Sequence, residues 1–173
     1  IHLILCAAQE IERRVVILRD FCSIIAKKDG VVMGNKICGR QSFQLENPPV
    51  ITAWASVAGK KESEGPLGKT FDITHSDSYF GQKTWEQGEK AMQQMALKRL
   101  GQKAGISERD FGLVFSGDLL NQCIGSSFTL RNMGIPHIGL YGACSTMAES
   151  LLMASMAVGG GFSDKVVAMP PSP

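Results

Sequence analysis

The sequence has few histidines, no paired cysteines and little net charge. Its three histidines are far apart and its five cysteines form no Cys-x-x-Cys pair, so the spacing typical of a zinc site is absent. An odd number of cysteines without a disulfide pattern indicates a reducing compartment. A net charge of +2 gives no reason to expect a nucleic-acid partner or a polybasic membrane anchor. We therefore expect no metal, no cofactor and no nucleic acid.

Long apolar runs and nucleotide-binding loops are also missing. No run reaches the length of a membrane span. Gly59-Lys60 lacks the upstream glycine and the following Ser or Thr of a Walker motif. The apolar N-terminal stretch has no basic region before it, which argues against a signal peptide. At 173 residues the chain has the length of about one domain and can bury a core.

Residues 1–32 differ in amino-acid composition from the rest of the chain. Charged residues between positions 10 and 20 alternate with Val, Ile and Leu, a pattern that predicts an amphipathic helix ending near Gly30. Acidic residues among the basic ones argue against a helix lying on a membrane surface. We divide the chain at Met33 into a loosely attached helical extension, residues 1–32, and a main domain, residues 33–173.

The main domain alternates strand and helix patterns joined by short loops. Such alternation predicts βαβ units, and therefore an α/β fold with a mostly parallel sheet and helices on its faces. The expected strands are 50–57, 111–116, 137–141 and 164–169, and the expected helices are 84–103, 124–133 and 145–159.

The stretch from Gly139 to Ser150 reads as a strand end, a tight turn and a helix start. Gly142 and Ala143 are small, so the backbone can turn sharply there. The positive end of the helix dipole favours a thiolate at Cys144, as in a nucleophile elbow with cysteine in place of serine. The alternative is an inert cysteine, because free cysteines are commonly buried. The helix start carries residues suited to a cap or first turn: Ser145, Thr146 and Glu149.

Polar side chains follow the strand at 111–116, namely Asp118, Asn121 and Gln122. In parallel sheets the carboxyl ends of the strands border the ligand crevice, so these residues are expected near Cys144. The alternative is that Asp118 and Asn121 only cap the following turn.

Six short blocks carry a resemblance to a known family. They are Gly65-Pro-Leu-Gly68, Phe71-Asp72, Gln82-Lys-Thr-Trp-Glu86, Gly117-Asp-Leu-Leu-Asn-Gln122, Gly134-Ile-Pro136 and Tyr141-Gly-Ala-Cys-Ser-Thr146. Their order and spacing resemble the stage V sporulation protein AD family of endospore-forming bacteria, from about Met33 to about Ala168. The last block alone indicates only the thiolase-like superfamily, whereas the Gly-Pro-Leu-Gly and Gly-Asp-Leu-Leu-Asn-Gln blocks are more specific.

The resemblance implies a thiolase-like fold, related to the condensing enzymes of fatty-acid synthesis. It also implies that the protein binds dipicolinic acid (pyridine-2,6-dicarboxylate) and serves its uptake, with calcium, into the developing spore. The family acts on the cytoplasmic side, peripheral to the spore inner membrane, so other proteins of the channel complex there are expected partners. A homo-oligomer is a further option. Cys144 falls on the acyl-carrying nucleophile of true condensing enzymes, but in the sporulation protein it lines the ligand pocket.

Three departures from the family pattern affect this interpretation. Residues 1–32 have no counterpart, and at 169–173 the sequence departs where the family continues with a second half of similar size. A frameshift or early stop would leave a truncated, N-terminal half. The condensing enzymes take a histidine, and a second histidine or asparagine, from the missing half, and His2, His75 and His137 match neither. Cys144 would then be a nucleophile without a base or a complete oxyanion site.

Dipicolinate is a planar dianion, so its pocket needs N–H groups or cations for the carboxylates and a flat surface for the ring. The helix start offers N–H groups, and Asn121 and Gln122 offer amide hydrogens. Asp118 would repel the ligand unless it turns away or shares calcium, so we assign it a structural role. The predicted ligand-binding residues are Asn121, Gln122, Cys144, Ser145 and Thr146, with no metal ligands. The alternatives are a thiolase-like acyltransferase or condensing enzyme that uses Cys144 covalently, and a non-functional fragment that cannot bury its sheet.

Overall fold

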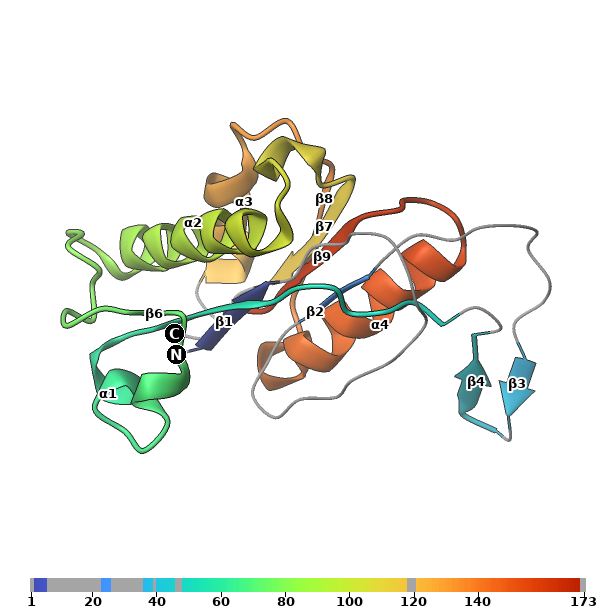
Figure 1. The fold of residues 1–173 in the computed structure, drawn as a ribbon, viewed down its shortest axis with the longest axis horizontal. Coiled ribbons are helices and arrows are strands. Elements are labelled where there is room, and N and C mark those ends of the chain that lie inside the picture. The colour runs from blue at the N-terminus through green and yellow to red at the C-terminus, as the bar shows by residue number, and fades with distance from the viewer. Residues whose placement is uncertain are drawn as a thin grey trace.

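The structure, a computed structural model, describes nearly all of the chain from residue 48 onward and several short segments before it. The described residues are 2–5, 23–25, 36–38, 40–45, 48–117 and 121–171. Helices lie on both sides of the central strands in Figure 1, so the molecule has the layered α/β architecture that the sequence predicts.

The central four-stranded sheet has the order β2-β9-β7-β8. Its strands are β2 (Ser23–Ile25), β9 (Val166–Met169), β7 (Leu113–Gly117) and β8 (His137–Leu140). β7 pairs in parallel with both β8 and β9, whereas β2 is antiparallel to β9. All of β9 and most of β7 are buried. Burial on both faces explains why these two strands are continuous apolar runs rather than alternating ones.

A second sheet has the order β1-β5-β6. It contains β1 (His2–Leu5), β5 (Ala55–Ala58) and β6 (Ile73–Thr74). β5 is fully buried, antiparallel to β1 and parallel to β6. β1 also contacts β9, so the second sheet adjoins the first along that strand (Figure 1).

A small hairpin of β3 (Lys36–Cys38) and β4 (Ser42–Gln44) projects from the rest of the molecule (Figure 1). Ile37 and Phe43 face each other across it and are both exposed, Ile37 by 84%. Leu45, just after the hairpin, approaches Gly159 at the end of helix α4 (Thr146–Gly159), which connects this segment to the body.

The long helix α2 (Trp85–Ala104) confirms the expected helix at 84–103. It begins at Thr84, whose hydroxyl accepts a hydrogen bond from the Gln87 N–H at 3.3 Å. It ends at Gly105, which adopts a left-handed conformation with φ of 67°. The short helix α1 (Lys60–Ser63) precedes it in the chain.

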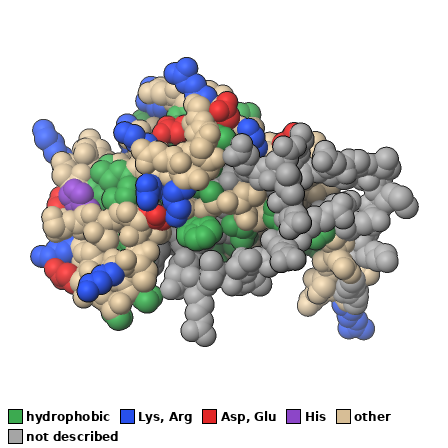
Figure 2. Space-filling view, viewed as in Figure 1, with side chains coloured by type: hydrophobic (Ala, Val, Ile, Leu, Met, Phe, Trp, Pro, Cys, Tyr) green, Lys and Arg blue, Asp and Glu red, His purple; other side chains and the backbone are tan. Residues whose placement is uncertain are grey.

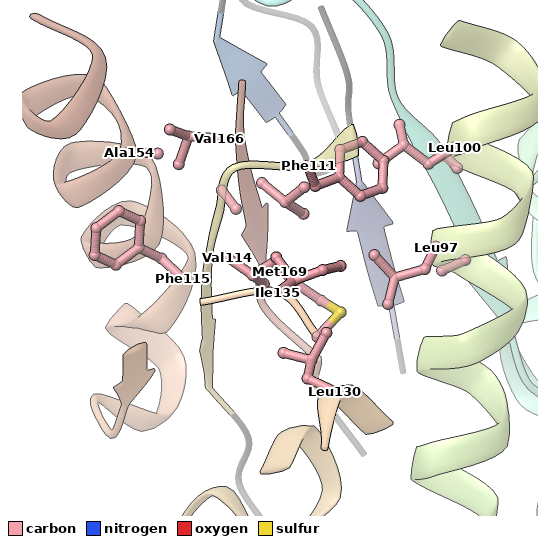
Figure 3. Close-up of a cluster of buried hydrophobic side chains, with 14 of the residues drawn as sticks. Leu97, Leu100, Phe111, Val114, Phe115, Leu130, Ile135, Ala154, Val166 and Met169 are labelled. Carbon is pink, nitrogen blue, oxygen red and sulfur yellow. The ribbon is translucent and has the colours of Figure 1, made fainter. Parts of the chain in front are cut away.

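Helices cover the two faces of the central strands. α3 (Ile124–Leu130) packs against α2 on one side, and α4 (Thr146–Gly159) packs against β7 and β9 on the other. In Figure 3 the side chains of Phe115 and Val166 lie on the α4 side, near Ala154, and those of Leu97 and Leu100 come from α2. Short 3-10 turns link these elements: η1 (Gly68–Thr70), η2 (Glu108–Asp110), η3 (Asn121–Cys123) and η4 (Ala143–Ser145).

The helix expected within residues 1–32 is absent at the positions that the structure describes there. Those positions form β1 and β2, which pair with β5 and β9. The physical reason is composition, because Leu and Ile in these two short segments suit a strand that completes a sheet. The other residues of 1–32 lie outside the described part of the chain, so the division at Met33 remains a prediction.

Candidate functional site at the carboxyl ends of β7 and β8

Cys144 lies in η4, between the end of β8 and the start of α4. This is the strand-to-helix turn that the sequence predicts. Cys144 and Ser145 are exposed, whereas Thr146 is buried. A reagent or ligand can therefore reach the thiol from solvent, while the Thr146 side chain belongs to the packed base of the turn.

The turn is sharp because of Ala143 rather than Gly142. Ala143 has a positive φ of 49°, while Gly142 has a φ of −115° that other residues also adopt. Gly142 contributes in a different way: the Ser145 Oγ and the Glu149 Oε2 lie where a Cβ on it would stand. The small side chain at 143 thus allows the turn, and the missing one at 142 allows a close approach.

The polar groups of the turn are largely bonded to one another. The Ser145 hydroxyl donates to the Gly142 carbonyl at 2.7 Å, and the Gly142 N–H donates to the Thr146 hydroxyl at 3.2 Å. The Ser145 N–H also donates to the Gly142 carbonyl, at 3.0 Å, and the Thr146 N–H donates to Ala143. Ser145 makes no side-chain cap bond to α4. Two of the N–H groups expected to bind an anion are therefore already engaged in the turn.

The end of β7 touches this turn directly. A Cβ on Gly117 would collide with the Leu140 carbonyl and with the Thr146 Cγ2, so β7, β8 and α4 meet at Gly117. The Cys123 Sγ donates to the Leu140 carbonyl at 3.0 Å, which connects the segment after β7 to the same strand end. The two sequence blocks that carry the predicted site are thus neighbours in space.

The predicted residues after β7 are only partly described. Asp118 lies outside the described residues, and for Asn121 the structure gives the backbone of η3 but not the side chain. Gln122 is exposed, with φ of 53°, and Cys123 has φ of 71°. Two consecutive non-glycine residues in the left-handed region are strained, and such strain gathers at ligand sites. Their roles in binding remain predictions.

Sequence reasoning missed Cys123 and the position of the Glu149 side chain in this region. Cys123 bonds to the end of β8, and the Glu149 carboxylate lies over Gly142. The strand-end position of the two blocks could have indicated Cys123. Nothing in the residue types could have shown that Glu149 folds back over the turn.

His75 and His137, which the sequence analysis rejects as bases for Cys144, lie elsewhere in the structure. His137 begins β8 and Cys144 follows the end of that strand, so the strand separates them by about 10 Å or more. The His75 ring stacks on Phe80 with centroids 5.0 Å apart and accepts the Asp77 N–H at 3.1 Å. Both observations agree with the expectation that neither histidine serves Cys144.

Charge and metal ligands are dispersed over the described residues. Basic and acidic side chains are interspersed on the described part of the face in Figure 2, so this face presents no uniform field. Among the same residues, no three His, Cys, Asp or Glu side chains are grouped so that they could hold a metal ion. Nor does any helix in this part of the chain combine the length and apolarity needed to cross a bilayer.

Comparisons with known proteins agree with the resemblance seen in the sequence. The family model for stage V sporulation protein AD (SpoVAD) matches residues 39–172. Stage V sporulation protein AD of Bacillus subtilis (strain 168) is 36% identical over 133 residues. The match covers 77% of this chain and 39% of the relative, so the chain spans well under half of the relative's length. The chain belongs to the stage V sporulation protein AD family.

Proposed function

We propose that this chain is part of a sporulation protein that binds dipicolinate and serves its uptake, with calcium, into the developing spore. In this proposal the Cys144 turn and the Asn121-Gln122 segment form one wall of the ligand pocket. The observation that carries it is the contact at Gly117, where the family-specific block after β7 meets Leu140 and Thr146. Family membership supports the proposed setting, a protein peripheral to the spore inner membrane on its cytoplasmic side, with proteins of the channel complex as partners.

The exposed groups of the wall suit a planar ligand that carries hydrogen-bond acceptors. The Gln122 side chain is exposed and can donate amide hydrogens, and the thiol of Cys144 is exposed beside a helix start. A wall of this kind supplies pairing groups on one side only. A ligand held against it remains partly hydrated, so its affinity is far below that of an enclosed pocket.

Calorimetry with dipicolinate tests the proposal. We compare this chain with a longer version completed by the part of the Bacillus subtilis relative that has no counterpart here. The completed protein is expected to bind more tightly, because it adds the facing wall. Asn121→Ala is expected to weaken binding, and the control Asn132→Ala, at an exposed turn after α3, is expected to leave it unchanged. Absence of binding by the completed protein would exclude the dipicolinate proposal.

A second candidate function rests on the exposure of Cys144 at its turn. In an acyl transfer, the Cys144 thiolate attacks the carbonyl of an acyl thioester, a new carbon–sulfur bond forms, and the carrier thiolate leaves and takes up a proton. Incubation with an acyl thioester followed by peptide mass spectrometry tests this reaction. An acyl adduct on Cys144, absent from Cys123, would favour the acyltransferase over the binding protein.

A further inference from the structure

Glu149 places a negative charge at the same turn as Cys144. It lies in the first turn of α4, it is half-buried, and its Oε2 occupies the space that a Cβ on Gly142 would need. Gly142 is two residues before Cys144, and its carbonyl accepts both the hydroxyl and the N–H of Ser145. The carboxylate therefore lies beside the backbone of the turn.

The Glu149 carboxylate lies near the amino end of α4 and acts on the charge there. The amino end of a helix carries a partial positive charge that attracts anions, and a carboxylate in the first turn compensates it. The Ser145 N–H and the Thr146 N–H, which would otherwise reinforce that attraction, donate to carbonyls within the turn. An anionic ligand approaching Cys144 thus meets a weakened dipole and a nearby carboxylate.

We propose that Glu149 is the charge-selecting residue of the Cys144 turn. It disfavours free anions there, and it favours ligands that are neutral or that arrive with a cation. This inference rests on the proposed function for the identity of the natural ligand. The electrostatic effect of Glu149 does not depend on that ligand, so it can be measured on the Cys144 thiol.

The first test compares two alkylating reagents of similar size and different charge. Iodoacetate is an anion and iodoacetamide is neutral, and each transfers its methylene carbon to the thiolate sulfur with loss of iodide. The ratio of the iodoacetate rate to the iodoacetamide rate at Cys144 is measured by peptide mass spectrometry at one pH. We expect Glu149→Gln to raise this ratio about two- to five-fold, the size of one nearby charge in a largely aqueous setting.

Two controls accompany this measurement. Glu108→Gln removes an equal charge from η2, just before β7 begins, at the opposite end of the sheet, and is expected to leave the ratio unchanged. A small free thiol added to every sample corrects for reagent concentration. A ratio at Cys144 that is the same in the wild type and in Glu149→Gln would overturn the inference.

The second test is the dissociation constant for dipicolinate on the same three proteins, each completed with the part of the Bacillus subtilis relative that has no counterpart here. We expect Glu149→Gln to tighten binding by a factor similar to or larger than the change in alkylation ratio, because dipicolinate is a dianion. Binding that is unchanged or weakened by Glu149→Gln would overturn the inference while leaving the proposed function intact. If none of the proteins binds dipicolinate but the alkylation ratio rises in Glu149→Gln, the proposed function fails and the charge-selecting role is supported.

Discussion

Gly117 is the residue at which the two blocks of the candidate site touch. Any side chain there would occupy space that the Leu140 carbonyl and the Thr146 Cγ2 already fill. Because one of these atoms belongs to the backbone of β8, it cannot move aside as the end of a flexible side chain could. The packing of the site therefore depends on the absence of a single methyl group.

Replacement of Gly117 by alanine is expected to destabilise the protein by about 1–3 kcal/mol, the usual effect of overpacking a closed contact. The free energy of unfolding in urea measures this. Gly59→Ala is the matched control, since a Cβ at Gly59 would meet only Phe80, at an ordinary contact distance of 3.8 Å. Equal stability of Gly117→Ala and the wild type would show that β8 and α4 are less closely packed on β7.

Asp77 organises the loop before α2 through its ionised form. The N–H groups of Gly81 and Tyr79 donate to its carboxylate at 2.8 and 3.1 Å, and these two bonds, with Gly81 contributing most, lower the pKa of Asp77 below 3.8. A lowered pKa in the folded state means that the stabilisation is present above the ordinary pKa and is lost as the pH falls through the folded value.

We therefore expect the amide hydrogens of Gly81 and Tyr79 to exchange faster in Asp77→Asn than in the wild type at neutral pH. After correction for intrinsic exchange rates, the difference in exchange rate narrows as the pH falls through the lowered pKa of Asp77, because the wild-type carboxyl then becomes neutral as well. Asp164→Asn, in an exposed bend before β9, is the control. If the exchange rates of the wild type and Asp77→Asn differ by the same amount at every pH, this account is wrong.

At the scale of elements, the sequence predicts the long helices and the strands at 111–116, 137–141 and 164–169 closely, and the strand at 50–57 poorly. The helices expected at 84–103 and 145–159 are observed at Trp85–Ala104 and Thr146–Gly159, because start and stop residues and a long pattern specify them together. The strand expected at 50–57 is observed at Ala55–Ala58. Short strands depend on partners far away in the chain, which local patterns do not contain.

The candidate site is likewise predictable from the sequence only in part. The turn at Cys144 follows from local pattern, since a strand, small residues and a helix start succeed one another there. Whether the left-handed residue is Gly142 or Ala143, and where the Glu149 carboxylate points, depends on contacts between atoms of different elements. No property of the residues taken singly determines these contacts.

Buried and exposed leucines of the helices are expected to differ in their sensitivity to substitution. Leu97 on α2 is fully buried in the core, whereas Leu152 on α4 is 45% exposed. Leu97→Ala is expected to cost about 2–5 kcal/mol of unfolding free energy, because it removes buried contacts and leaves a cavity. Leu152→Ala removes the same atoms from a partly exposed position, so the expected loss of unfolding free energy is well under half as large. Equal losses in urea unfolding would show that another surface covers Leu152 in solution.

At the scale of the whole molecule, β1 and β2 complete sheets that the main domain begins. β9 lies between β2 and β7 in the sheet order, and β5 lies between β1 and β6. Removal of residues 1–32 makes β5 and β9 edge strands. Their backbone groups then lack the partners that β1 and β2 supply. The fully buried strands β5 and β9 would then border solvent on one side.

We expect the chain that begins at Met33 to melt several degrees lower than the whole chain, since the loss of even about 1 kcal/mol shifts the melting temperature of a domain of this size by about 2–4 °C. It is also expected to associate more readily, because open sheet edges pair with one another. Thermal unfolding followed by circular dichroism and size-exclusion chromatography measure the two effects. The control removes only residues 172–173 at the other end. An unchanged melting temperature and an unchanged elution volume would favour the loosely attached extension that the composition of residues 1–32 predicts.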